Sequence, residues 1–146
     1  MVDSAYGTTD MFAAFHASVV TLILPAGTVT LTFGARPPRT VPTPGGIITA
    51  ANPGYTQAEA LNARASRALH ALLHRRQLWH VPTVSAATDG THREVGFFVT
   101  GVTCDELVRI GRAFGQQAVF WLSDMGLGVV ACGQLIPYRK PSREPT

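Results

Sequence analysis

The chain has 146 residues, of which 46% are hydrophobic and 14% are charged. This composition argues against a disordered chain, and the length suits one domain with one core. The longest apolar run, Val19–Leu24, is too short to cross a bilayer, so we expect no membrane partner. The net charge of +3 and the pI near 9.3 permit an anionic partner but do not require one.

Cysteine usage and the N-terminus indicate where the protein works. Cys104 and Cys132 are the only cysteines, and they form neither a C-x-x-C pair nor a zinc-binding spacing. The first ten residues carry acids where a signal peptide would carry lysines. We therefore predict a reduced, cytoplasmic protein with one domain over residues 1–136 and a flexible basic tail over residues 137–146.

The N-terminal half begins with two runs rich in β-branched residues. Residues 18–24 and 28–33 flank a short Pro-Ala-Gly segment, which is typical of a β-hairpin. Residues 34–46 are dense in proline and glycine and predict a connecting loop. Residues 47–50 then form a short apolar strand that leads into a helix.

The first predicted helix starts at Thr56, which forms a T-x-x-E capping box with Glu59. Its apolar residues recur at helical spacing as far as Leu73. The segment from Thr56 to His80 contains four arginines and three histidines but one acid, which indicates a solvated face or an anion-binding surface. A strand over residues 78–84 follows.

The second predicted helix follows a strand over residues 94–100. Thr103 and Glu106 form another capping box, and Gly115 ends the helix because glycine tolerates left-handed geometry. Strands over residues 118–123 and 128–132 complete the chain.

The order of these elements from Ile47 onward is β-α-β-β-α-β. Two strand-helix-strand units in succession predict an α+β fold with a ferredoxin-like split β-α-β core. The N-terminal hairpin and the C-terminal strand would be additions to that core.

This topology predicts that polar side chains from distant parts of the chain meet at one edge of the sheet. That edge also receives the N–H groups of the first helix, which favour an anion. Amides and a carboxylate can read hydrogen-bond donors of a ligand. We therefore expect a small polar or anionic ligand there. The predicted ligand-binding residues are Thr49, Asn52, Asn62, Arg64 and Gln116, together with Glu94.

Two versions of this site remain open. In an enzyme, Glu94 would be the catalytic acid or base and the amides would orient the substrate. In a binding protein, the same groups would only hold the ligand. The alternative without a site is that Asn52, Pro53 and Gly54 form an ordinary turn. The sequence predicts no cofactor and no metal.

Short motifs in this region resemble those of the bacterial family called domain of unknown function 3293. The matching positions are Thr49–Ala50, Asn52–Pro53, Asn62, Glu94, Phe114–Gln116 and Ala118. Ala51 stands where the family usually has an aromatic residue, and Val95–Gly96 replaces its usual pair. The resemblance implies that these polar residues matter, and it implies no particular activity.

An RNA-binding module of ferredoxin-like topology is an alternative. Residues 93–100 resemble the RNP1 motif of RNA recognition domains in a basic start, a glycine and Phe97, but they lack two of its aromatic positions. Without stacking platforms, single-strand recognition loses roughly 1–3 kcal/mol per base. A protein-interaction adaptor that uses the hairpin or an open strand edge is a further alternative.

Histidines and a cysteine suggest two other chemistries. His70 and His74 are one helical turn apart, and His80 could add a third metal ligand, although a glutamate between the pair is missing. Cys104 lies in the first turn of a helix, where a thiol can become acidic. We interpret the histidines as a solvent-facing pair and both cysteines as structural.

Overall fold

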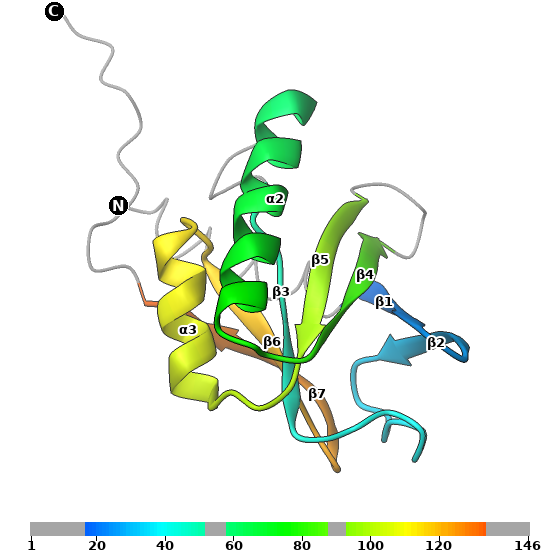
Figure 1. The fold of residues 1–146 in the computed structure, drawn as a ribbon. Coiled ribbons are helices and arrows are strands. Elements are labelled where there is room, and N and C mark those ends of the chain that lie inside the picture. Colours follow the sequence, from blue (N-terminus) through cyan, green and yellow to red (C-terminus); the bar gives the residue numbers. More distant parts are fainter. Residues whose placement is uncertain (1–16, 52–57, 88–92, 134–146) are drawn as a thin grey trace, which may run out of the picture.

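The computed structural model describes residues 17–51, 58–87 and 93–133, which fold into one sheet and two helices (Figure 1). In chain order the elements are β1 (Ser18–Leu24), β2 (Gly27–Thr32), β3 (Gly45–Ile48), α2 (Glu59–Arg75), β4 (His80–Ala87), β5 (Glu94–Val99), α3 (Cys104–Ala113), β6 (Ala118–Ser123) and β7 (Gly126–Ala131). Each predicted strand and helix thus has a counterpart. The predicted tail over residues 137–146 lies outside the described residues.

The sheet contains the seven strands in the order β2-β1-β4-β5-β3-β6-β7. Every neighbouring pair of these strands is antiparallel. The hairpin β1–β2 joins the sheet through β4, and β7 joins it through β6. Central strands β3 and β5 are buried along most of their length, as expected for strands covered on both faces.

The sheet curls into a half-barrel. Phe33, just after β2, bridges to Leu127 in β7, so the two outermost strands approach each other at one end. Leu22 of β1 and Leu122 of β6 belong to one buried cluster although three strands separate them in the sheet. Together with the bridge between Phe33 and Leu127, this shared cluster indicates that the sheet wraps around these side chains, which fill the inside of the curl.

This architecture corrects the predicted fold class. The structure is a strand-rich, curled half-barrel with two helices, and the prediction of an α+β ferredoxin-like core with added strands was wrong. The hairpin and β7 are integral to the sheet, because they contribute Val20, Leu31 and Leu127 to the cluster inside the curl. The sequence pattern identified the strands but contained no signal for the curl.

Both helices lie on the same outer face of the sheet (Figure 1). Helix α2 packs against β5, and α3 packs against β3 and β6. A second buried cluster forms here, with Leu69 and Leu73 of α2 and Leu107 of α3 fully buried. Gly46 of β3 permits this close approach, because a Cβ atom there would collide with the Leu107 side chain.

The two helix starts differ. Helix α3 has the predicted capping box: the Glu106 N–H donates to Thr103 Oγ1 (3.1 Å), and the Thr103 N–H donates to Glu106 Oε1 (2.8 Å). Helix α2 has Ala58 as its N-cap, with no side-chain hydrogen bond. The predicted box of Thr56 with Glu59 was wrong, because Glu59 is the first helical residue rather than the third. Thr56 itself lies outside the described residues.

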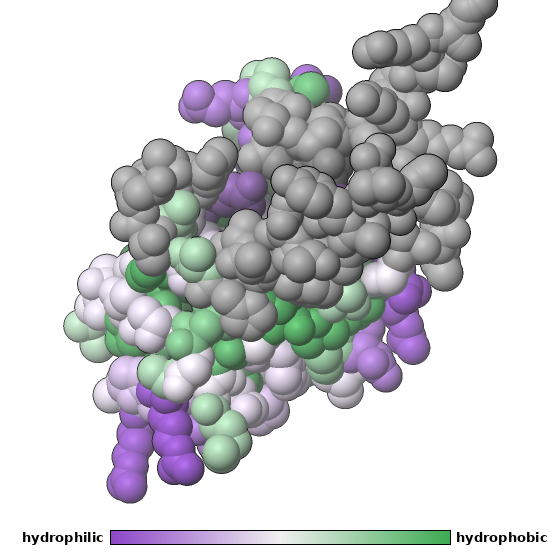
Figure 2. All heavy atoms as spheres, turned by 180° about the vertical axis from the view of Figure 1, so that it is seen from behind, coloured by the Kyte–Doolittle hydropathy of each residue, from purple (hydrophilic) through white to green (hydrophobic). Residues whose placement is uncertain are grey.

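On the face opposite the helices, the described residues near the middle are mostly apolar, and hydrophilic ones lie towards the margins (Figure 2). Neither of the described helices has the length and hydropathy needed to cross a bilayer.

Candidate functional site

Three segments meet at the edge of the sheet where β3 ends. Because β5 and β6 both run antiparallel to β3, their first residues lie beside its last ones. The pairs Ile48 with Phe97 and Ile47 with Phe120 fix this register. We call this edge the β3 rim and define it as residues 49–51, Glu94, Val95 and Gln116.

Thr49 ties two of these segments together. Its hydroxyl donates to the Val95 carbonyl (2.8 Å) and accepts a hydrogen bond from the Ala51 N–H (3.0 Å). The first bond fixes β3 to β5, and the second shapes the backbone as it leaves β3. The Thr49 side chain therefore shapes the rim.

Gln116 connects the third segment to the rim. It follows α3, is 9% exposed, and donates from Nε2 to the Ala51 carbonyl (3.0 Å) and, at 3.4 Å, to the Phe114 carbonyl. Its backbone N–H also donates to the Gly111 carbonyl (2.9 Å). Within the part of the chain that the structure describes, no donor reaches Gln116 Oε1. The carboxamide is thus held in place by its nitrogen, and its oxygen is the atom that can accept a further hydrogen bond.

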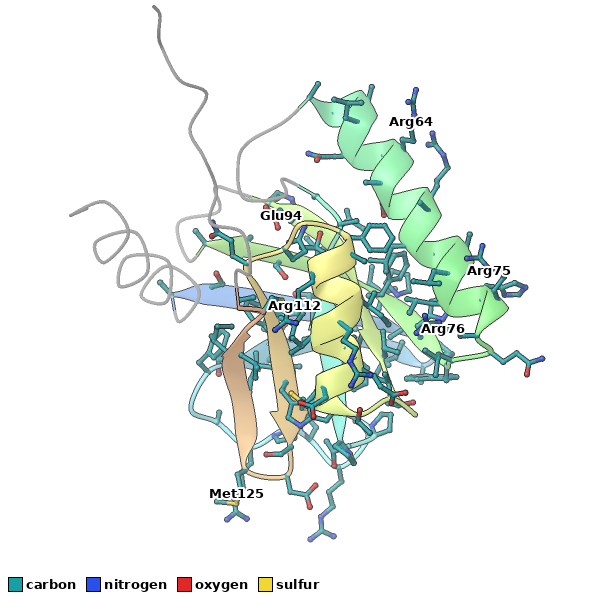
Figure 3. The ribbon with its side chains drawn as sticks, turned by 90° about the vertical axis from the view of Figure 1, so that its left-hand side faces the viewer. Arg64, Arg75, Arg76, Glu94, Arg112 and Met125 are labelled. Carbon is teal, nitrogen blue, oxygen red and sulfur yellow. The ribbon has the colours of Figure 1, made fainter. Side chains whose placement is uncertain are left out.

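Glu94 is the first residue of β5 and is half-buried. It pairs with Ser85 of β4, and the next residue, Val95, accepts the Thr49 hydrogen bond. The structure therefore places Glu94 on the same rim as Thr49 and Gln116. Figure 3 shows the Glu94 side chain at this end of the sheet.

The other predicted site residues are on α2 or lie outside the residues that the structure describes. Arg64 is exposed on α2, and Figure 3 shows its side chain directed away from Glu94. Asn62 is half-buried in the first turn of the same helix. Asn52 lies outside the described residues. The structure thus brings together Thr49, Glu94 and Gln116 and does not bring Arg64 to them.

The role of Arg112, a cation in the last turn of α3, was not predicted from the sequence. Arg112, in the last turn of α3, donates from Nε to the Cys132 carbonyl, and the Cys132 N–H donates to the Gln117 carbonyl (2.9 Å). These bonds hold the end of β7 against the end of α3, next to Gln116. Figure 3 shows Arg112 between these two elements. No sequence motif indicates this role of Arg112, because its partner is a backbone carbonyl twenty residues further along the chain.

Neither cysteine is prepared to act as a nucleophile. Burial raises the pKa of Cys132 to about 11. Burial also raises the pKa of Cys104, and the adjacent Asp105 carboxylate adds to the effect. Both thiols therefore stay protonated near neutral pH. Cys104 also lies at the start of α3, at the opposite end of the sheet from the β3 rim.

Two histidines, His70 and His80, pack against Phe97 of β5, and His74 stacks on His70 from the exposed side. The rings of His70 and His80 have centroids 5.0 Å apart, and each lies within 6 Å of the Phe97 ring. The Nδ1 atom of His80 is 2.7 Å from the Leu78 carbonyl oxygen. Among the described residues, no group of three potential ligands is arranged to hold a metal ion. This cluster supports the contact between α2 and the sheet.

The aromatic residues of the sheet are used for packing. Phe97, Phe98 and Phe120 are each less than 9% exposed and belong to the two cores. They cannot stack on nucleic-acid bases without unfolding. The RNA-binding alternative based on the face of the sheet therefore has no exposed ring at these three positions.

The comparison with known families identifies the chain. Residues 48–119 match the family described as protein of unknown function DUF3293. The chain belongs to this family. The matching segment of this chain begins at the end of β3 and ends at the start of β6, so it includes Glu94 and Gln116 and excludes the hairpin β1–β2. No curated protein and no solved structure matches the chain.

Proposed function

We propose that this DUF3293 domain binds a small polar ligand at the β3 rim. The observation that carries the proposal is the Gln116 carboxamide, which is almost completely buried and donates from its nitrogen to the Ala51 carbonyl, while none of the described residues donates to its oxygen. An oriented amide of this kind is typical of ligand sites, in which a few polar groups fix the ligand.

The chemistry of the rim suggests which ligand it takes. Gln116 Oε1 and the Glu94 carboxylate are acceptors, so the ligand should offer N–H or O–H donors to them. Arg112 is exposed in the last turn of α3, the helix that ends shortly before Gln116, and would complement an anionic group at the other end of the ligand. Small molecules with both features, such as amino acids and nucleotides, are therefore the first compounds to test.

Glu94 decides between a binding protein and an enzyme. In the enzyme, its carboxylate would transfer a proton to or from the bound ligand. In the binding protein, the carboxylate would only accept hydrogen bonds. We propose a cytoplasmic setting for either activity, because Cys104 and Cys132 are both free thiols.

The test is a thermal-shift screen of the full chain with L-amino acids, nucleosides, nucleotides and inorganic phosphate. A ligand at about 100 times its Kd should stabilise the fold by about 2.7 kcal/mol and raise the Tm. Glu94→Gln keeps the shape of the side chain and should abolish this shift while leaving the ligand-free Tm nearly unchanged. Glu59→Gln, at the exposed start of α2, is the matched control and should retain the shift.

Two results would contradict the proposal. In the first, a compound raises the Tm of Glu94→Gln as much as that of the unsubstituted protein. In the second, no compound of the panel raises the Tm, and Glu94→Gln lowers the ligand-free Tm strongly, which would make Glu94 a structural residue.

A further inference from the structure

We propose that the chain forms a homodimer through the open edge of β2. We call residues Thr28–Thr32 of this strand the β2 edge. In the dimer, the β2 edge pairs antiparallel with the same residues of a second copy, so that one sheet continues across both chains. The β2 edge lies outside the segment that matches DUF3293 and is separate from the β3 rim, so this proposal does not depend on the function proposed above.

The β2 edge has no neighbouring strand on one side within the part of the chain that the structure describes. Strand β2 pairs with β1 and is the outermost described strand of the sheet (Figure 1). Phe33 follows β2 and bridges in parallel to Leu127, near the start of β7. The residues of β2 before Phe33 therefore extend past the start of β7, and no described strand lies beside them.

Three residues of the β2 edge point their backbone hydrogen-bonding groups away from β1. Leu24 and Gly27 flank the two-residue turn and form the hydrogen-bonded pair that closes the hairpin. In an antiparallel ladder, such pairs alternate with pairs that are not hydrogen-bonded. This alternation directs the N–H and C=O groups of Thr28, Thr30 and Thr32 towards the open side. A strand aligned with them can exchange about six hydrogen bonds with β2.

The β2 edge lacks the features that protect edge strands from pairing with another chain. Natural proteins place charged residues, prolines or bulges on such strands. The sequence of β2, Gly-Thr-Val-Thr-Leu-Thr, has no charge and no proline, and its register with β1 is unbroken. Four of its six residues are exposed, whereas Ala131 alone is exposed in β7, the outermost described strand on the other side. Strand β2 is therefore the one to which a further strand can be added.

The sequence of the β2 edge favours a second copy as the partner. Thr-Val-Thr-Leu-Thr has the same pattern of threonine and apolar residues in both directions, centred on Thr30. In a two-fold dimer with this centre, Thr30 lies opposite Thr30 of the second copy, and Thr28 lies opposite Thr32. Val29 then lies opposite Leu31, so apolar side chains meet each other. Pairs of threonines across strands are favourable, and an uncharged strand brings no like charges together at the two-fold axis.

The surroundings of the β2 edge also allow two copies to approach. Val20 and Leu22 of β1 point into the cluster inside the curl, so Val19, Thr21 and Ile23 lie on the outer face beside the threonines of β2. These three residues carry no charge. The exposed arginines of α2 belong to a helix that packs against β5, and two strands, β1 and β4, separate β5 from β2. The contact therefore does not bring the cationic surfaces of the two copies together.

Sedimentation velocity of the full chain tests the association. A contact between two six-residue strands is small, so the dimer should dissociate with a Kd of roughly 1–100 μM. Over protein concentrations from about 1 μM to about 1 mM, the mass should rise from that of one chain, 15.6 kDa, towards twice this value. Thr30→Lys places two like charges at the two-fold axis and should raise the Kd about tenfold or more. Thr21→Lys, the matched control, makes the same change at the β1 neighbour of Thr30, one strand further from the contact, and should retain the dimer.

Thiol substitutions test the register of the contact. Thr30→Cys brings two thiols to positions with Cα atoms about 5.5 Å apart, which suits a disulfide, so oxidised glutathione should link the two chains. In Thr28→Cys, each new thiol would lie opposite Thr32 of the second copy. The two new thiols would then be four residues, or about 14 Å, apart along the strands and should stay unlinked. Cys104 and Cys132 are present in both variants and do not affect the comparison.

Three results would overturn the proposal, provided that circular dichroism shows each variant to be folded. A mass of one chain at every concentration would exclude the dimer and leave the β2 edge to an extended segment of another protein. Equal losses of association in Thr30→Lys and Thr21→Lys would place the contact on the face of the sheet. Equal cross-linking of Thr30→Cys and Thr28→Cys would exclude the register centred on Thr30.

Discussion

Helices α2 and α3 lie side by side on the same face of the sheet but are built differently. Helix α3 has a complete capping box and packs against two central strands, β3 and β6. Helix α2 has no side-chain cap at Ala58, packs against β5, and exposes a row of arginines. The difference indicates that α3 mainly supports the fold and the β3 rim, whereas α2 exposes a cationic surface to the solvent.

The largest expected effect on stability comes from removing a buried side chain of α3. Leu107→Ala should lower the free energy of unfolding by about 2–5 kcal/mol, because this fully buried side chain fills the space above Gly46. Leu61→Ala removes an equally large side chain from the exposed side of α2 and should change stability by less than about 0.5 kcal/mol. Urea denaturation of both variants measures the difference. Similar losses would contradict the assigned roles of the two helices.

The cap of α3 should give the next largest effect. Thr103→Ala removes the acceptor for the Glu106 N–H and should destabilise the protein by about 1 kcal/mol. The Tm and the urea midpoint measure this loss. Thr103→Ser keeps the hydroxyl and is the control. A loss of the same size in Thr103→Ser would mean that the methyl group, not the cap, is responsible.

The missing cap of α2 allows the opposite experiment. Ala58 has φ −61° and ψ 147°, the extended geometry of an N-cap residue. Ala58→Asp should therefore stabilise the protein by about 0.5–1 kcal/mol, since it supplies an acceptor and a negative charge at the helix start. Ala58→Leu, which cannot accept a hydrogen bond, should give no gain. If Ala58→Asp also left the urea midpoint unchanged, the start of α2 would not be limited by its cap.

A smaller, pH-dependent difference between the helices should also be measurable. Hydrogen bonds from the backbone and side chain of Thr103 are the main cause of the lowered pKa of Glu106. A carboxylate whose pKa is lower in the folded state stabilises the fold above its ordinary value of 4.5 and loses this contribution as the pH falls through the folded value. The stability of the protein should therefore decrease more than that of Glu106→Gln, which has no carboxyl group to titrate, between about pH 6 and pH 3. If the stability of both proteins fell equally with pH, the capping box would not lower the pKa of Glu106.

Local signals were sufficient to predict the elements and part of the rim. The T-x-x-E pattern at Thr103 and the terminating Gly115 mark α3 correctly, because capping depends on neighbouring residues. The same pattern at Thr56 failed. Glu59 has the right spacing, yet the helix starts there, so spacing alone does not decide which residue becomes the N-cap.

Contacts between residues that are distant in the chain could not be predicted from these local sequence patterns. The curl depends on Phe33 meeting Leu127 and on apolar side chains from both ends of the chain sharing one cluster. Gln116 was predicted at the rim from the strand directions, but the role of the Ala51 carbonyl as its partner was not. The role of Arg112 was not predicted because its hydrogen-bond partner, the Cys132 carbonyl, comes from another part of the chain.

The central claim is that the β3 rim receives a small polar ligand, and NMR on ¹⁵N-labelled protein tests it most directly. The Gln116 side-chain amide donates to Ala51, so a ligand that binds its oxygen should shift the resonances of this NH₂ group and of the Thr49 and Val95 backbone amides. We predict that a compound from the amino-acid and nucleotide panel shifts these signals in the protein and not in Glu94→Gln. Shifts confined to α2, or none with the entire panel, would contradict the account.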